Sequence, residues 1–232
     1  MPEPMVNLDA EKLVAARRAV EFVEDGQVVG LGTGSTAAHA IREIGRRVRE
    51  GLQIVAIPTS LATEALARSL GIPLTNFDEH QKIDIAIDGA DEIDSNLVAI
   101  KGGGGAFLRE KIVAQAATRM ICIIDSSKLV PQIGAAKLPI EVLPFAAGFV
   151  QAAVAAMGAQ VSLRRKADGS LFATDQGNAV LDARFGLLSN PEALARKLTS
   201  IPGLLAHGLF LSEIDELITG RGDQAECLRR SA

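Results

Sequence analysis

The sequence of 232 residues contains no tryptophan or tyrosine and only two cysteines. Without those aromatic rings there is little material for stacking against nucleic-acid bases. Cys122 and Cys227 are too few and too far apart in the chain to suggest a disulfide framework, and Cys122 lies in an apolar run that predicts a buried free thiol. Because disulfides are not expected, the cytoplasm is the expected compartment.

Patterns that mark other classes of protein are also missing. No apolar run reaches the roughly 18 residues of a membrane span, and residues 1–10 lack the pattern of a signal peptide. The net charge is −4 and no basic cluster occurs, which argues against nucleic acid as a partner. His39, His80 and His207 do not have metal-ligand spacing, so no metal site is predicted.

Strand-like and helix-like segments alternate over the first 130 residues, and 48% of all residues are hydrophobic, enough for a packed core. The hydrophobic spacing predicts helices over 9–24, 37–48, 61–70 and 106–117, and strands over 28–31, 53–57, 83–87 and 120–124. This alternation predicts an α/β fold with a Rossmann-like, mostly parallel sheet flanked by helices.

The pattern changes after Pro131, where prolines interrupt the chain. Helices are expected over 146–157 and from Asn190-Pro191 to 199, with strands over 160–164 and 178–181. These segments predict a second, smaller α/β (α+β) domain over 131–204, acting as a lid or in oligomerisation. The end of the chain is expected to return to the first sheet, so the catalytic domain is predicted to comprise residues 1–130 plus 205–232.

Four consecutive glycines, residues 102–105, follow Lys101 and precede Glu110. Glycine lets a backbone approach a ligand closely and adopt positive φ without strain. A cation and a carboxylate beside such a loop predict a site for a small oxygen-rich anion with acid–base chemistry. A flexible linker is the alternative, which the apolar flanks disfavour. Arg109-Glu110-Lys111, taken alone, is more typical of a solvated helix face.

Three further motifs follow predicted strands, where parallel sheets bind ligands. Residues 32–36, Gly-Thr-Gly-Ser-Thr, precede a helix and suit one phosphate, or form a plain turn with Ser35 or Thr36 as N-cap. Asp88 and Asp91 can converge on sugar hydroxyls, the alternatives being a helix N-cap cluster or a metal site. Lys128 either reaches a phosphate or is an ordinary exposed lysine.

Taken in order along nearly the whole chain, these motifs resemble the type A ribose-5-phosphate isomerases, as do Ile140-Glu141-Val142 and Gly208-Leu209-Phe210. The resemblance implies interconversion of D-ribose 5-phosphate and D-ribulose 5-phosphate through an enediolate, in the pentose phosphate pathway. It also implies a homodimer or homotetramer that needs no metal or organic cofactor. The chemistry agrees with the residues, because an aldose–ketose shift needs a base, oxyanion stabilisation, help with ring opening and a phosphate handle.

The resemblance implies roles for individual residues. Glu110 is the base that shuttles the proton, Asp88 assists ring opening, and Asp91 and Lys101 bind the sugar oxygens and stabilise the enediolate. Lys12 falls where the family often has a phosphate-binding lysine. The implied substrate contacts are Lys12, Thr33, Gly34, Ser35, Thr36, Asp88, Gly89, Ala90, Asp91, Lys101, Gly102, Gly103, Gly104 and Lys128.

Two other functions are alternatives to the isomerase. A phosphosugar-sensing module of a transcription regulator would bind without chemistry, but few residues precede the first predicted helix to form a DNA-binding unit. An acyl-CoA transferase-like enzyme would use a glutamate nucleophile, but the sequence does not indicate a pocket for a long CoA arm. The complete acid–base set favours the isomerase.

Overall fold

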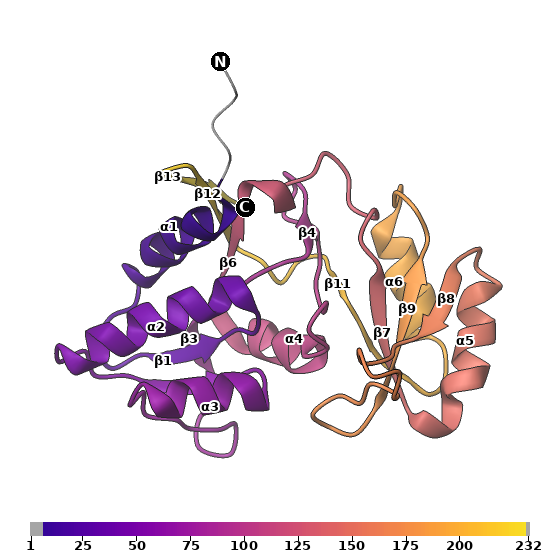
Figure 1. Ribbon diagram of the computed structural model, residues 1–232, viewed down its shortest axis with the longest axis horizontal. Helices are drawn as coiled ribbons and strands as arrows, with labels where there is room; N and C mark the ends of the chain where they lie inside the picture. The colour runs from indigo at the N-terminus through magenta and orange to yellow at the C-terminus, as the bar shows by residue number, and fades with distance from the viewer. Residues whose placement is uncertain (1–6, 231–232) are drawn as a thin grey trace.

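The computed structural model of the protein describes residues 7–230, built around a six-stranded sheet (Figure 1). The strand order is β13-β12-β6-β3-β1-β2, and every neighbouring pair is parallel except β12 with β13. The strands are β1 (Val28–Leu31), β2 (Val55–Pro58), β3 (Ile83–Asp88), β6 (Ala117–Asp125), β12 (Glu216–Arg221) and β13 (Gln224–Arg229). The predicted mostly parallel sheet is therefore confirmed. Residues 1–6 and 231–232, which the predicted catalytic domain includes, lie outside the described residues.

Helices cover both faces of this sheet because its strand residues alternate between two cores. Ile85 and Ile87 of β3 pack with the helices α1 (Leu8–Val20), α2 (Ser35–Arg49) and α3 (Leu61–Ser69). Ala86, which lies between them, packs on the other face with α4 (Phe107–Ala116). The fully buried thiol of Cys122 belongs to the core on the α4 side and is free, as its apolar surroundings predict.

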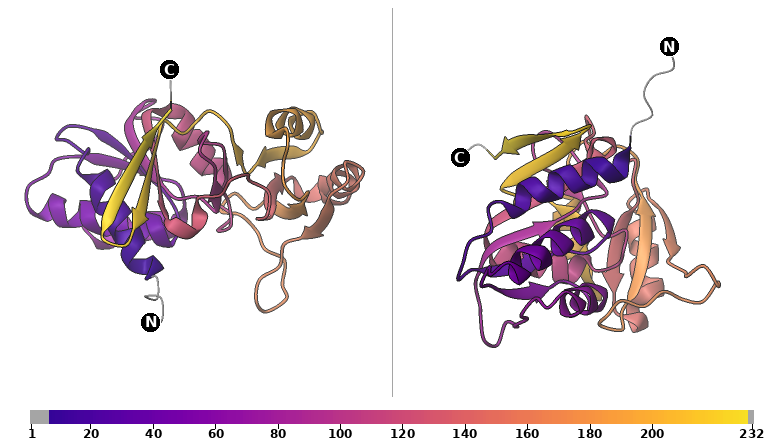
Figure 2. Two further views of the ribbon diagram at one scale, coloured as in Figure 1. Left: turned by 90° about the horizontal axis from the view of Figure 1, so that it is seen from above. Right: turned by 60° about the vertical axis from the view of Figure 1, so that its left-hand side comes forward.

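A second sheet of four antiparallel strands lies to one side of the first (Figure 2). Its order is β10-β7-β9-β8, formed by β7 (Leu138–Val142), β8 (Gln160–Leu163), β9 (Ala179–Arg184) and β10 (Leu204–His207). Helices α5 (Ala147–Ala155) and α6 (Pro191–Thr199) contribute Val150 and Leu198 to its core, and the short helix η2 (Pro144–Ala146) precedes α5. Since β10 continues to His207, the domain boundary expected after residue 204 falls inside a strand.

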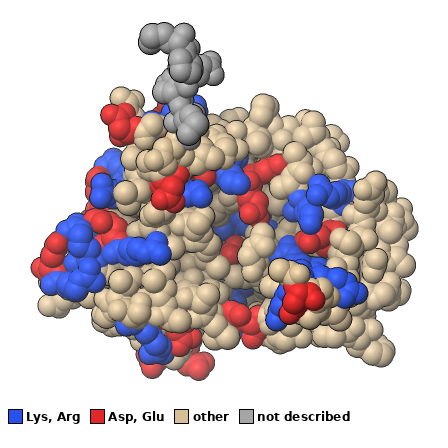
Figure 3. All heavy atoms as spheres, viewed as in Figure 1, with Lys and Arg blue, Asp and Glu red and all other residues tan. Residues whose placement is uncertain are grey.

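A third, small sheet connects these parts. It is antiparallel, with the order β11-β5-β4, and consists of β4 (Glu92–Ile93), β5 (Ala99–Ile100) and β11 (Leu209–Phe210). The short helix η1 (Ser126–Lys128) follows β6. Within residues 7–230, no helix combines the length and apolar character needed to cross a membrane. Acidic and basic side chains are interspersed on the face shown in Figure 3.

Candidate active site

The motifs after the strands come together at one edge of the parallel sheet. Strands β2, β1, β3 and β6 are neighbours that run in the same direction, so their carboxyl ends share an edge. Gly32 follows β1, Asp88 ends β3, and Ser126 follows β6. Lys101 and the glycines directly follow β5 and lie at the same edge. The next helix, α4, places Glu110 beside them.

A cavity of about 180 Å³ lies between these segments. Of the residues implied by the resemblance, Asp88 alone does not line the cavity. The lining residues are Lys12, Thr33, Gly34, Ser35, Thr36, Gly89, Ala90, Asp91, Lys101, Gly102, Gly103, Gly104, Glu110 and Lys128. The structure thus brings together residues from α1 to η1, the short helix that follows β6.

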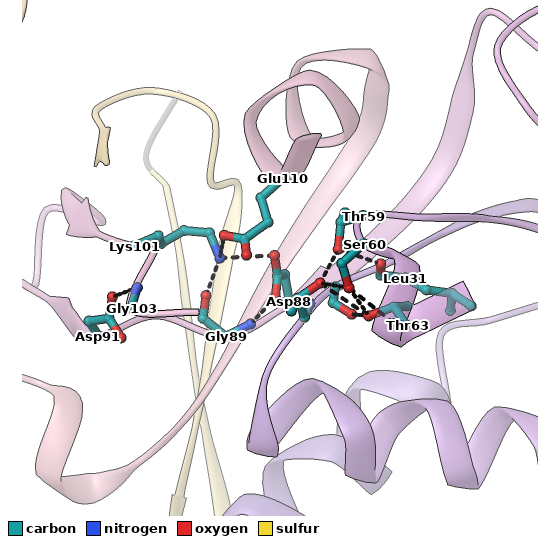
Figure 4. A network of polar contacts seen from close by, with 12 residues as sticks. Leu31, Thr59, Ser60, Thr63, Asp88, Gly89, Asp91, Lys101, Gly103 and Glu110 are labelled. Carbon is teal, nitrogen blue, oxygen red and sulfur yellow. Dashed lines mark hydrogen bonds and ion pairs between the residues drawn. The ribbon is translucent and has the colours of Figure 1, made fainter. Parts of the chain in front are cut away.

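A buried ammonium group between two carboxylates forms the centre of the site (Figure 4). Lys101 Nζ lies 2.9 Å from Asp88 Oδ2 and 3.1 Å from Glu110 Oε2, and it also donates to the carbonyl oxygen of Gly89. The exposed fractions of Lys101, Asp88 and Glu110 are only 2%, 3% and 4%. Two carboxylates and one ammonium carry an excess negative charge, which is costly away from water.

Burial and the excess negative charge shift the pKa values of Glu110 and Lys101. Burial raises the pKa of Glu110 to about 8, the Lys101 ammonium opposes that rise, and the Asp88 carboxylate adds to it. Burial alone would lower the pKa of Lys101, but the Asp88 and Glu110 carboxylates outweigh burial and raise it. The ammonium therefore stays charged, and the Glu110 carboxyl gains or loses its proton near neutral pH.

Glycine is required where the backbone turns towards Glu110. Gly102 has φ of +106°, and a Cβ there would lie 2.5 Å from the ring of Phe107 and 2.7 Å from Pro139. The loop can therefore pack tightly on the first residue of α4 only without a side chain. Glu110 lies in the first turn of that helix, so the conformation of the glycine loop sets where its carboxylate points.

The two aspartates have different surroundings. Asp88 Oδ1 accepts from the backbone N–H groups of Gly89 at 2.7 Å and Thr33 at 3.0 Å, behind the wall of the cavity. Gly32 makes room for it, since a Cβ at that residue would lie 2.1 Å from Asp88 Oδ1. Asp91 lines the cavity, and its Oδ2 accepts from Gly103 N at 2.7 Å. No helix follows this motif, so the alternative of a helix N-cap cluster is wrong; Glu92 begins β4 instead.

The other end of the cavity suits an anion. Gly34 is the N-cap of α2 and its first turn contains no acidic side chain, so free N–H groups and the helix dipole face the cavity. The alternative of Ser35 or Thr36 as the cap is wrong, because both lie inside the helix. Lys12 Nζ donates to Ser35 Oγ at 3.1 Å, and half-buried Lys128 lines the same end.

Supporting residues that the sequence interpretation missed lie beneath this end. The Thr33 hydroxyl lies 2.7 Å from Thr59 Oγ1 and 2.9 Å from Ser60 Oγ, and Thr63 Oγ1 donates to Gly32 O at 2.8 Å (Figure 4). Thr59 and Ser60 directly follow β2, as the predicted site motifs follow β1 and β3, so their position after a strand is the sequence signal that indicates them.

One further residue connects the helices α1 and η1, which carry Lys12 and Lys128. Glu11, next to Lys12 on α1, is buried, and its carboxylate accepts from the backbone N–H and the hydroxyl of Ser126, which begins η1. Its other oxygen accepts from Gly222 N at 2.9 Å. Local sequence gives no signal for this role, because the partners lie more than a hundred residues away.

Among residues 7–230, no three His, Cys, Asp or Glu side chains are grouped as metal ligands.

A family model with the description ribose 5-phosphate isomerase A (phosphoriboisomerase A) matches residues 55–224. The chain belongs to this family. Ribose-5-phosphate isomerase A of Sphingopyxis alaskensis is 54% identical over 226 residues, which cover 97% of this chain and 99% of that protein. The resemblance read from the motifs is therefore confirmed.

Two solved structures of ribose 5-phosphate isomerases share the fold. The isomerase A of Methanocaldococcus jannaschii is 40% identical, with a TM-score of 0.90 over 94% of this chain and 97% of its own. A D-ribose-5-phosphate isomerase in complex with phospho-erythronic acid is 36% identical, with a TM-score of 0.94 over 97% of this chain and 100% of its own. The predicted α/β fold class is thus confirmed at the level of the whole chain.

Proposed function

We propose that this chain interconverts D-ribose 5-phosphate and D-ribulose 5-phosphate, a step of the pentose phosphate pathway, through an enediolate. The observation that carries the proposal is the Lys101 ammonium held between Asp88 and Glu110 in a cavity whose other end suits an anion. Membership of the ribose 5-phosphate isomerase A family supports this reaction. The relative's complex with phospho-erythronic acid supports a phosphorylated sugar as the ligand.

In this mechanism Glu110 takes the proton from C2 of the open-chain aldose and returns it to C1, and the reverse direction uses the same steps. The electron pair of the broken C2–H bond forms the C1=C2 double bond of the enediolate, and the carbonyl electrons move to O1, whose negative charge the Lys101 ammonium stabilises. When C1 takes up the proton from Glu110, the proton on O2 passes to O1, which leaves the C2 carbonyl of the ketose. The N–H groups of the glycine loop and Asp91 orient the sugar hydroxyls. Glu110 and Lys101 both line the cavity already. Neither side chain therefore needs a large movement to contact the sugar.

The position of Asp88 favours an indirect role. Help with ring opening requires contact with the sugar, whereas Asp88 lies behind Lys101 with one oxygen bound to two backbone N–H groups. We propose that Asp88 acts through Lys101, by fixing its ammonium and raising its pKa. Asp91, on the wall of the cavity, is better placed for contact with the ring oxygen.

Replacing Lys128 with alanine should raise KM for ribose 5-phosphate about tenfold or more while changing kcat much less, because one phosphate contact is worth roughly 1.5–3 kcal/mol. Steady-state kinetics measure both constants. Lys197→Ala, which removes an exposed lysine from α6, is the matched control and should leave them unchanged. An unaltered KM in Lys128→Ala would contradict the proposed phosphate contact.

The value of kcat/KM should rise with pH and level off above about 8, because Glu110 must lose its proton to act as a base. Below that pKa the decrease should approach tenfold per pH unit. Asp88→Asn should move the midpoint to lower pH, since the Asp88 carboxylate helps to raise the pKa of Glu110. The phosphate of the substrate also titrates, but its pKa would not move in the variant; an unmoved midpoint would therefore assign the profile to the substrate.

Ketose formation from D-ribose 5-phosphate by the purified protein, with EDTA present, tests the function as a whole. Rapid formation of ribulose 5-phosphate supports a metal-independent isomerase. Binding of the sugar phosphate without turnover would indicate a sensing module instead. A thioester formed between Glu110 and CoA would indicate an acyl-CoA transferase-like enzyme.

We also propose that the chain has two domains. The second, over about 131–204, contains the four-stranded sheet with α5 and α6 and acts as a lid or in oligomerisation. Assembly into a homodimer or homotetramer is supported by exposed apolar side chains at its surface, among them Phe145 and Phe149. The two free cysteines and the phosphorylated metabolite as substrate support the cytoplasm as the compartment.

A further inference from the structure

An arginine next to the second sheet donates hydrogen bonds to the outer side of the glycine loop, residues 102–105. Arg164 directly follows β8, and its Nη1 donates to the carbonyl oxygens of Gly102 at 3.0 Å and Gly103 at 3.1 Å. Only 12% of its side chain is exposed, and it does not line the cavity. Figure 1 shows how the segment after β8 returns from the second sheet towards α3 and α4.

The guanidinium of Arg164 is itself fixed. Its Nε lies 3.1 and 3.2 Å from the two carboxylate oxygens of Asp182 on β9, and its Nη2 forms an ion pair with the same side chain. Phe172 lies beneath it, with the ring centre 5.5 Å from Cζ, and packs on the loop where a Cβ at Gly105 would lie 2.4 Å from that ring. Because these contacts fix the planar guanidinium of Arg164, its remaining N–H groups point in a single direction.

Because the peptide bond is planar, the hydrogen bonds from Arg164 also orient the N–H groups on the other side of the loop. In a trans peptide the C=O and the following N–H point in opposite directions. Because Arg164 binds the carbonyl of Gly102, the N–H of Gly103 points away from it, and Asp91 Oδ2 accepts that N–H at 2.7 Å. Likewise, the bond to the carbonyl of Gly103 directs the N–H of Gly104, a cavity-lining residue, away from Arg164.

We propose that Arg164 is a positioning residue for the isomerase reaction, orienting Asp91 and the loop N–H groups towards the sugar. This inference rests on the proposed function. Four consecutive glycines have wide conformational freedom, so without Arg164 the two peptide units would sample other orientations. Donors that must be ordered during the reaction stabilise a transition state less than donors held in place beforehand.

The variant Arg164→Gln tests the proposal, with Arg165→Gln as its matched control. Arg165 is the next residue, is exposed, and donates through Nη1 to Gly169 of its own hairpin. We expect kcat/KM for ribose 5-phosphate to fall about 10²-fold in Arg164→Gln, the scale of a 1 Å misplacement, and to stay within about twofold in Arg165→Gln. Arg164→Lys keeps the charge beside Asp182 without the fork and should recover part of the loss.

Two binding measurements separate positioning from general damage. Arg164→Gln should bind phospho-erythronic acid about tenfold or more weakly, because its sugar-acid oxygens need the glycine loop. Its affinity for inorganic phosphate should be unchanged, since that anion needs only the opposite end of the cavity. An equal loss for both ligands, in Arg164→Gln or in Arg164→Lys, would overturn the inference in favour of a merely structural role.

The outcomes for the wild type keep the two proposals apart. If the wild type forms ribulose 5-phosphate and Arg164→Gln matches its kcat/KM, the inference about Arg164 is wrong and the function stands. If the wild type does not turn over the sugar, the proposed isomerase is wrong. The ratio of the affinities for phospho-erythronic acid and inorganic phosphate then still decides whether Arg164 orders the loop for a ligand.

Discussion

Replacing Glu110 with glutamine should lower kcat for ribose 5-phosphate isomerisation by about 10³–10⁴-fold, the upper range for loss of a general base. Glutamine keeps the size of the side chain and an oxygen for Lys101, which lies 3.1 Å from Glu110 Oε2. Its amide cannot take up the proton that must leave C2. Since phosphate and sugar contacts remain, phospho-erythronic acid should bind with an affinity within a few-fold of the wild type. Kinetics and calorimetry measure the two quantities.

Stability provides a control for this variant. Because the pKa of Glu110 is raised to about 8 in the folded state, its contribution to stability is present below its unfolded pKa and is lost as pH rises towards 8. Glutamine removes that carboxylate, so Glu110→Gln should unfold at the same or a higher temperature than the wild type at pH 9. Glu192→Gln, an exposed change on α6, should keep full activity. Near-normal turnover in Glu110→Gln would refute its role as the base.

The part of the site that the sequence predicts follows from one rule of parallel sheets. Segments that follow neighbouring parallel strands must meet at one edge, whatever lies between them in the chain. This rule predicts residues 33–36, Asp91 and Lys128 as part of the site, and each of them lines the cavity. The glycines after Lys101 were informative for a different reason, because a run of them has no use in a strand or helix.

The remainder depends on contacts that no local pattern encodes. The indirect role that we propose for Asp88 depends on its depth, since only the structure shows that it lies behind Lys101. Arg164 and Glu11 act on loops 61 and 115 residues away in the chain. A charged residue in a strand or helix is most often solvated, so burial was the missing information for both. The short strands β4, β5 and β11 were also missed, because two residues are too few to show a period.

Replacing Lys101 with methionine should lower the free energy of unfolding by about 3–5 kcal/mol, the usual cost of removing one partner from a buried ion pair. Two carboxylates would then remain at a site where the exposed fractions are 3% for Asp88 and 4% for Glu110. The pKa of Glu110 should rise further without the ammonium that now opposes burial. Urea unfolding at pH 5, 7 and 9 measures the change, which should be largest at pH 9, where the carboxylates must carry charge.

A second substitution separates the two effects of Lys101. Asp88→Asn in the Lys101→Met background removes one of the unpaired charges and should recover a large part of the lost stability. Turnover should remain about 10³-fold or more below the wild type, because no ammonium group then stabilises the enediolate oxygen. Lys128→Met is the matched control, since that lysine lines the same cavity without a buried ion pair and its loss should weaken binding while leaving stability intact. If the double variant regained activity together with stability, Lys101 would have only a structural role, and another donor would have to stabilise the enediolate.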